Sequence, residues 1–215
     1  MPPTGVRVSA QTRRKPRQSR AKASSEALQE AFVRVLIDKG YAGVTVREVA
    51  AVAGVGIGTF YEYVANKEAL AALTIHLRVK TLAQALQSCA QAQAGHTPWS
   101  MVQAMMHELI DRVQADAISW AALFMLERQI SDPEVYRKHY EQFVNLWLQG
   151  LQAATPAIPT DQQATVARMV HSLVYGWVTQ CLLTQGPQLD WAQVRDTCTQ
   201  AVRAYLSTIT LAADL

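Results

Sequence analysis

The sequence predicts an all-α protein with three short helices, a connecting fourth and five longer ones. Ala, Leu, Gln, Arg and Glu, which favour helices, are plentiful, whereas strand-like runs are few. Apolar residues recur at helical spacing, and Gly, Pro and capping residues separate these segments. Half of the 215 residues are apolar, so the chain can bury a sizeable core.

Charge is distributed unevenly along the chain. Residues 1–80 hold thirteen Lys and Arg against six Asp and Glu, whereas residues 81–215 hold seven against eleven. A basic N-terminal third joined to a mildly acidic remainder indicates one part that meets a polyanion and one that does not.

The cysteines and apolar segments predict a cytoplasmic protein. Cys89, Cys181 and Cys198 are odd in number and widely spaced, which argues against a disulfide framework or a zinc site. The basic N-terminus has no apolar stretch of a secretory signal after it. Residues 169–189 lack charged side chains but contain Gln, Thr and His, which favours a helix buried by protein over a membrane span.

Residues 1–23 are expected to form a disordered basic arm. They contain Pro and seven Lys or Arg, and no acidic residue occurs before Glu26. Such an arm is either a solvating tail or a segment that lies along DNA phosphates.

The predicted DNA-binding domain covers residues 24–70. Apolar spacing from Leu28 indicates a first helix that ends at Gly40, a left-handed cap. The segment "TVRE" predicts a capping box in which Thr45 caps the Glu48 amide and Glu48 reaches back. Two short helices, 46–52 and 57–63, follow on either side of a glycine-containing turn. Asn66 caps a fourth, connecting helix of about 66–94.

The second predicted domain covers residues 71–215. Its longer helices are separated by "QAD", "SDP", "ATPAIPT" and "GPQLD", which contain residues that end or cap helices. The expected ranges are about 98–115, 117–130, 133–154, 161–185 and 191–211.

The stretch "AGVGIGTFY" at 53–61 distinguishes two kinds of site. Two short helices joined by a Gly turn describe a helix-turn-helix, with Val49, Ala50, Val55 and Phe60 facing inward. A nucleotide-binding loop would need a different glycine spacing and a preceding strand, and here a capped helix precedes it.

"GYAGVTVREVAAVAGVGIGTFYEYVANKEAL" at 40–70 resembles the DNA-binding domain of TetR-family transcriptional regulators. The resemblance runs without a gap over about residues 26–75. It departs from the family pattern at Gly56, where Ser is common, and at Tyr63, where His is frequent. Glycine is a tolerated helix cap, and Tyr63 keeps a hydroxyl donor.

The resemblance implies contacts with DNA from the turn and the second short helix. Thr45, Thr59, Tyr61, Tyr63 and Lys67 match the positions of phosphate contacts, and Arg47 matches a position that reads a base or holds a phosphate. Ile57 and Gly58 would lie nearest the bases, with Ile57 able to touch a thymine methyl.

Large side chains in the second domain form either a plain core or the wall of a ligand pocket. Relatives of the family hold a small-molecule effector in this body, which implies a pocket for an apolar or aromatic compound. The expected lining residues are Met105, Leu109, Trp120, Phe124, Tyr140, Phe143, Trp147, His171 and Tyr175.

The segment "HELID" at 107–111 is similar to a zinc-protease motif, but Asp111 replaces the second histidine. We therefore expect a polar helix surface, with no metal, cofactor or enzymatic activity. An enzyme that uses His107, Glu108 and Asp111, or the glycine run at 54–58, is the rival interpretation.

The last two predicted helices each carry a wide apolar stripe, so one face of each can pack on a second copy. The family also dimerises through these helices. The expected interface residues are Val170, Val174, Trp177, Val178, Val202, Tyr205 and Ile209.

These features predict a homodimeric, ligand-responsive repressor that a small effector releases from a near-palindromic DNA operator. The alternative is a regulator of the same fold that acts constitutively or through a protein partner.

Overall fold

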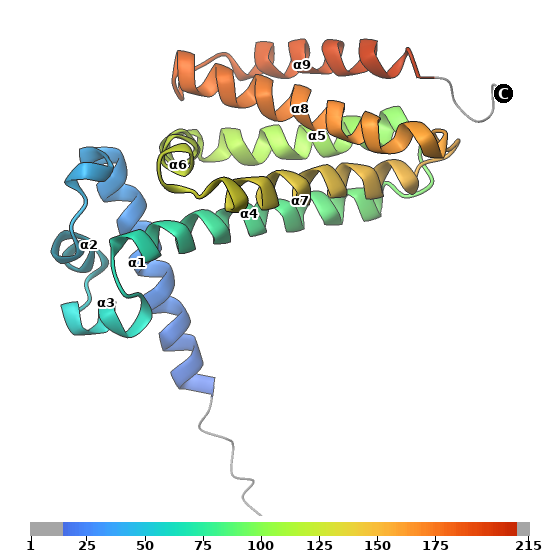
Figure 1. The fold of residues 1–215 in the computed structure, drawn as a ribbon. Helices are drawn as coiled ribbons and strands as arrows, with labels where there is room; N and C mark the ends of the chain where they lie inside the picture. Colours follow the sequence, from blue (N-terminus) through green and yellow to red (C-terminus); the bar gives the residue numbers. More distant parts are fainter. Residues whose placement is uncertain (1–14, 210–215) are drawn as a thin grey trace, which may run out of the picture. The chain divides into compact units, whose positions relative to one another are not determined.

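The structure, a computed structural model, describes residues 15–209, with side chains from residue 21 onward. In this range the chain forms nine α-helices and no strand, which confirms the predicted all-α fold (Figure 1). The helices are α1 (Lys15–Gly43), α2 (Val46–Ala53), α3 (Ile57–Tyr63), α4 (Lys67–Ala92), α5 (Pro98–Ala115), α6 (Ala117–Ile130), α7 (Pro133–Gln152), α8 (Thr160–Gln185) and α9 (Trp191–Leu206).

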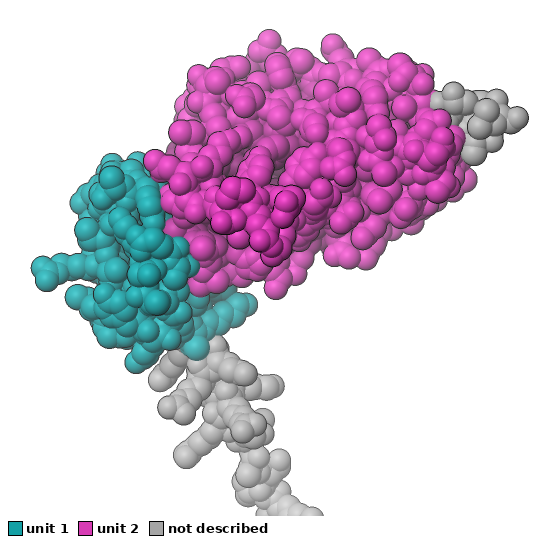
Figure 2. Space-filling model, in the orientation of Figure 1, with its two compact units in different colours: residues 1–70 teal, residues 71–215 magenta. Residues whose placement is uncertain are grey.

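The chain divides into two compact units, one that ends at Leu70 and one that begins at Ala71 (Figure 2). The first unit contains α1, α2, α3 and the first turn of α4. Its core forms where α1 packs on α2 and α2 packs on α3, and Phe32, Val49 and Phe60 have no exposed surface there. Ala50 is buried as predicted, and Val55 is half-buried.

Helix α1 differs from the prediction at its start. It begins at Lys15, so residues 15–23 are helical and the disordered arm predicted over residues 1–23 is corrected there. Its first turns are rich in Lys, Arg, Gln and Ala, which favour helices, and Pro16 is tolerated in a first turn. Residues 1–14 lie outside the described range. Gly40 has φ +66° and breaks the helical geometry where the sequence predicts the end of the first helix.

Helix α2 begins at the predicted cap, with one change of partner. The Glu48 amide donates to the Thr45 hydroxyl oxygen over 3.2 Å, which confirms the first half of the capping box. The Glu48 carboxylate does not reach back to the Thr45 amide and pairs with the Lys39 ammonium. The second half of the capping box therefore does not form, because the Glu48 carboxylate pairs with Lys39 near the end of α1 instead.

In the second unit, α8 packs between α7 and α9, and α5 contacts all three helices (Figure 1). Helix α6 packs on α5 and α8. The helix ranges predicted for this unit hold to within two residues, except at the last helix. Helix α9 ends at Leu206, whereas the sequence predicts an end near residue 211; Ser207 to Ile209 form a turn, and residues from 210 onward lie outside the described range.

The neighbours of α8 explain why this helix carries so few charges. Val170, Val174 and Val178 of α8, together with Val202 of α9, are buried inside their own unit. This corrects their assignment to a subunit interface, because side chains buried in one protomer have no surface to offer a second copy. Of the helices between residues 15 and 209, none combines the length and apolarity needed to cross a membrane.

Candidate functional site

A tight left-handed turn joins α2 to α3. Gly54 has φ +68° and ψ 28°, and its amide donates to the carbonyls of Ala50 and Ala51 at the end of α2. The Val55 amide also donates to the Ala50 carbonyl, over 3.0 Å. A side chain at Gly54 would be strained at this φ, so the glycine permits the turn that sets α3 against α2.

Helix α3 presents one face to solvent and one to the core. Phe60 is fully buried, whereas Ile57 is 45% and Tyr61 56% exposed, one helical turn apart. Gly58 lies beside them, and a Cβ added there would meet no atom within 4 Å. The Tyr61 ring lies edge-on to the Phe60 ring at 5.4 Å, which orients the tyrosine outward. The exposed face of α3 therefore carries the apolar side chain of Ile57, the uncovered backbone of Gly58 and the phenol hydroxyl of Tyr61.

The other residues expected at DNA lie on or beside the same two helices. Thr45 and Arg47 are exposed, and Thr59 and Tyr63 are half-buried. Gly56 begins α3 without a side-chain cap, as its replacement of serine predicts. The helix-turn-helix therefore brings these positions together, and their contacts with DNA stay predictions.

Lys67 has a structural role that the sequence does not reveal. Its ammonium donates to the carbonyls of Tyr41 and Val44, over 3.3 and 3.2 Å, and lies 4.7 Å from the centre of the Tyr41 ring. Asn66 caps the same helix end, as predicted, by accepting from the Ala69 amide over 2.8 Å. Lys67 thus fastens the first turn of α4 to the segment between α1 and α2, besides any contact with phosphate.

The second unit contains a cavity of about 50 Å³ with an almost entirely apolar wall. Seven of the nine residues expected at a ligand pocket line it. Its lining residues are Val79, Leu82, Leu109, Val113, Trp120, Phe124, Glu127, Tyr136, His139, Tyr140, Phe143, His171, Tyr175, Val178 and Thr179. A volume of this size holds a few water molecules, so a larger ligand must displace side chains.

Met105 and Trp147 are corrections to the predicted pocket. Both are completely buried but do not line the cavity. A Cβ at Gly150 would lie only 2.8 Å from the Met105 sulfur, so the glycine lets α5 and α7 approach closely around that side chain. The two residues therefore belong to the core between helices.

His171 is a deeply buried polar group of the wall. Its ring stacks on Phe143 and Tyr175, with centroids 5.8 and 5.5 Å apart, and Tyr140 lies at 5.1 Å. Burial lowers the pKa of His171 to about 4, so the imidazole is neutral near neutral pH. Within the described part of the chain, neither its Nδ1 nor the buried Thr179 hydroxyl has a hydrogen-bond partner.

Glu127 and His139 form a buried hydrogen-bonded pair in the same wall. Their side chains are 10% and 15% exposed, and the Glu127 carboxylate lies 2.8 Å from His139 Nδ1. Apolar periodicity could not reveal Glu127 and His139, because both are polar, or the exposed Tyr136, which lies in the largely polar stretch 132–139.

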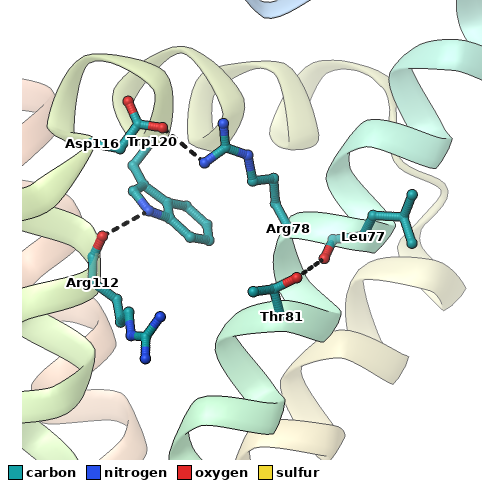
Figure 3. Close-up of polar contacts among 6 residues, drawn as sticks. All are labelled: Leu77, Arg78, Thr81, Arg112, Asp116 and Trp120. Carbon is teal, nitrogen blue, oxygen red and sulfur yellow. Dashed lines mark hydrogen bonds and ion pairs between the residues drawn. The ribbon is translucent and has the colours of Figure 1, made fainter. Parts of the chain in front are cut away.

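Trp120 is held in place at the turn between α5 and α6 (Figure 3). Its indole N–H donates to the Arg112 carbonyl over 3.2 Å. Beside it, the Arg78 guanidinium pairs with the Asp116 carboxylate over 2.8 Å, which ties α4 to the start of α6. This ion pair is about 40% exposed and contributes little stability, but it fixes the side of the cavity next to α4.

The residues of "HELID" at 107–111 make ordinary contacts at the protein surface. Asp111 pairs with Arg195, Glu108 pairs with Arg112 over 2.8 Å, and His107 lies 3.4 Å from the Thr199 hydroxyl. The described residues contain no group of three or more His, Cys, Asp or Glu that could hold a metal ion.

Comparisons with known proteins give a consistent result. Residues 28–73 match the model of the bacterial regulatory proteins of the tetR family. A search of curated proteins finds no match.

Solved structures are similar over most of the chain. A transcriptional regulator from Rhodococcus sp. Rha1 has a TM-score of 0.67 and 22% identity, over 89% of this chain and 98% of that one. FadR from Bacillus subtilis, in complex with stearoyl-CoA, has a TM-score of 0.68 and 17% identity, over 82% and 96%. A TetR-family regulator from Marinobacter aquaeolei VT8 has a TM-score of 0.61 and 20% identity, over 86% and 97%.

At these identities the likeness establishes the fold, and the sequence match establishes the N-terminal domain. Residues 28–73 are thus a domain of the tetR family of bacterial regulatory proteins, carried on a chain that has the fold of TetR-family transcriptional regulators.

Proposed function

We propose that the protein is a homodimeric repressor that binds a near-palindromic DNA operator and is released by a small apolar or aromatic effector. The exposed face of α3 carries this proposal. Ile57, Gly58 and Tyr61 leave that helix free to enter a major groove, while Phe60 holds its opposite side in the core. Two-fold symmetry would then place two such helices in successive grooves.

The exposed side of α8 supports dimerisation. Met169 is 44% and Trp177 39% exposed, two helical turns apart. The Trp177 indole donates to the Val194 carbonyl of α9 over 3.0 Å, so its ring spans both helices and offers an apolar surface. Half-buried Tyr205 and Ile209 can extend this surface. An isologous interface of α8 and α9 from each copy would cover it.

The response to an effector would pass through α4. Its first residue, Lys67, binds the carbonyls of Tyr41 and Val44 in the first unit, and Val79 and Leu82 further along line the cavity. A ligand that shifts these wall residues would bias the position of α4 and so the affinity for DNA. FadR, which has this fold, is known in complex with stearoyl-CoA, which supports a response to a small ligand.

DNA binding itself is tested with Arg47, which is exposed on α2. Wild type should bind a DNA fragment from upstream of its own gene more tightly than a scrambled fragment. Arg47→Ala should weaken binding and reduce the slope of log K against log salt by about one per arginine removed, because fewer counterions are released. Fluorescence anisotropy over a salt series measures both.

Arg34→Ala serves as the control, since Arg34 is exposed on α1, outside the helix-turn-helix. Equal affinity for both fragments, together with an unchanged slope in Arg47→Ala, would refute the DNA-binding role. If wild type binds DNA and no compound in a screen lowers its affinity, the protein is a constitutive regulator.

Trp177→Arg should convert the dimer into a monomer. The substitution is present twice in an isologous interface and would bury two guanidinium groups without partners, so we expect the dimer dissociation constant to rise at least about a hundredfold. Analytical ultracentrifugation measures this shift. Met125→Arg introduces the same change at an exposed residue of α6 and should leave the dimer intact. A monomeric wild type would rule out the proposed interface.

A further inference from the structure

The cavity wall has an unusual balance of charge. Its lining residues include one carboxylate, that of Glu127, and no Lys or Arg within the part of the chain that the structure describes. Six of them carry Trp, Phe or Tyr rings. We propose that the effector is an organic cation, with an aromatic or apolar body and a single positive charge. This inference rests on the proposed function and specifies the ligand class of its site.

Glu127 supplies the negative charge. Its side chain is only 10% exposed, and among the described residues its carboxylate forms a hydrogen bond with His139. A neutral imidazole can donate one N–H to the carboxylate without cancelling its charge, so the pair then carries one net negative charge. A buried charge of this kind is costly without a compensating partner, and a ligand cation would supply one.

Aromatic rings around the pair favour the same ligand. Trp120, Phe124 and Tyr175 share the wall with Glu127, and their rings contact one another at centroid distances of 5.3 and 5.8 Å. The negative faces of such rings attract cations, and the attraction is strongest where water is excluded. A carboxylate ligand would meet the opposite environment, since no Lys or Arg lines this cavity.

Neighbouring groups do not reverse this balance. His171 is neutral because its burial lowers its pKa, so it adds no positive charge. Arg128, the cation next along α6, is exposed and donates to the Phe124 carbonyl over 3.2 Å. The unpartnered His171 Nδ1 and Thr179 hydroxyl can accept or donate a hydrogen bond at the ligand's uncharged end.

The first turns of α7 can open to admit a ligand to the cavity. Residues 133–138 are all exposed, and Tyr136 among them also lines the cavity at 36% exposure. A segment with so few buried contacts can shift at low cost, which a cavity of about 50 Å³ requires before it accepts a ligand.

Two probes of nearly the same shape test the charge. Phenyltrimethylammonium is the cation, and 2-phenyl-2-propanol is its uncharged counterpart. Titration calorimetry of the full chain without DNA, in mildly alkaline buffer, should give about tenfold tighter binding for the cation. Equal or tighter binding of the alcohol would overturn the proposal, and so would no binding of the cation.

The variant Glu127→Gln tests whether the Glu127 carboxylate causes the preference for the cation. This variant keeps the shape and a hydrogen bond to His139, so the cation should lose about tenfold in affinity while the alcohol binds as before. Glu134→Gln removes an exposed carboxylate on α7 and should change neither. An unchanged preference in Glu127→Gln would overturn the role of Glu127. If that variant does not fold, the wild-type comparison still decides the ligand class.

Failure of this inference is separate from failure of the proposed function. If an uncharged or anionic compound releases the protein from operator DNA and the cation does not, the cation class is wrong and the repressor function stands. If the protein does not prefer its upstream DNA, the repressor function fails whatever the cavity binds.

Discussion

Gly58→Glu should abolish operator binding and leave the fold intact. A Cβ at position 58 meets no atom within 4 Å, and Gly58 does not adopt a left-handed φ, so the protein can accept a side chain there. The carboxylate would face the phosphates from the surface predicted to lie nearest the bases. Like charges brought together at an interface cost several kcal/mol, and the proposed dimer would carry the change twice, so we expect affinity to fall by about a thousandfold or more.

Two further substitutions at position 58 distinguish the effect of the side chain's charge on DNA binding from the effect of its size. Gly58→Lys should bind better than Gly58→Glu, because its ammonium can approach phosphate, but its specificity should fall. Gly58→Ala should lose about tenfold in affinity by preventing close approach, while gaining about 0.5 kcal/mol in stability from its greater helix propensity. Anisotropy with operator DNA and denaturant unfolding measure these effects. Wild-type affinity in both Gly58→Ala and Gly58→Glu would show that α3 does not face the bases.

Trp147→Ala should be the most damaging single change in the second unit. The side chain is the largest of those that are completely buried, and it lies one helical turn before Gly150, where α7 closely approaches Met101 and Met105 of α5. Its removal leaves a cavity in a close-packed region, and such truncations of Trp or Phe cost about 3–5 kcal/mol. Unfolding in guanidinium chloride, followed by far-ultraviolet circular dichroism, measures the loss.

A half-buried tryptophan provides the comparison. Trp99 lies at the start of α5, where the Arg203 guanidinium stands 5.4 Å from its ring, and Trp99→Ala should cost about 1–2 kcal/mol. Trp147→Phe should lose less than Trp147→Ala, because the phenyl ring fills part of the space and the unpartnered indole N–H disappears. Equal losses at Trp99 and Trp147 would contradict the assignment of Trp147 to the core.

The features that the sequence predicted well depend on neighbouring residues. The cap from Thr45 to Glu48, the left-handed turn at Gly54 and the cap from Asn66 to Ala69 each involve groups within five residues of one another. Such interactions leave a residue-specific signature, so the helix-turn-helix and most helix ends could be located without a structure.

Residues that form the cavity could be predicted only in part. Leu109, Trp120 and Phe124 are large and apolar, and they were identified on that basis. The buried pair of Glu127 and His139 is not predicted by the sequence, because helical periodicity assigns such polar residues to a solvated face. The sequence assigns Met105 and Trp147 to the pocket wrongly, because large apolar residues of the same types form both a close-packed core and a pocket wall.

By itself the sequence determined that this protein is all-helical, that its N-terminal helices form a DNA-binding motif, and where that motif turns. Only the tertiary structure decided which side of each long helix is covered. Val170 and Trp177 lie on one helix, yet the first is buried in its own protomer and the second is 39% exposed. Lys67 meets carbonyls 23 and 26 residues away. Periodicity defines the faces of a helix, but which neighbour packs on each face depends on contacts between residues far apart in the chain.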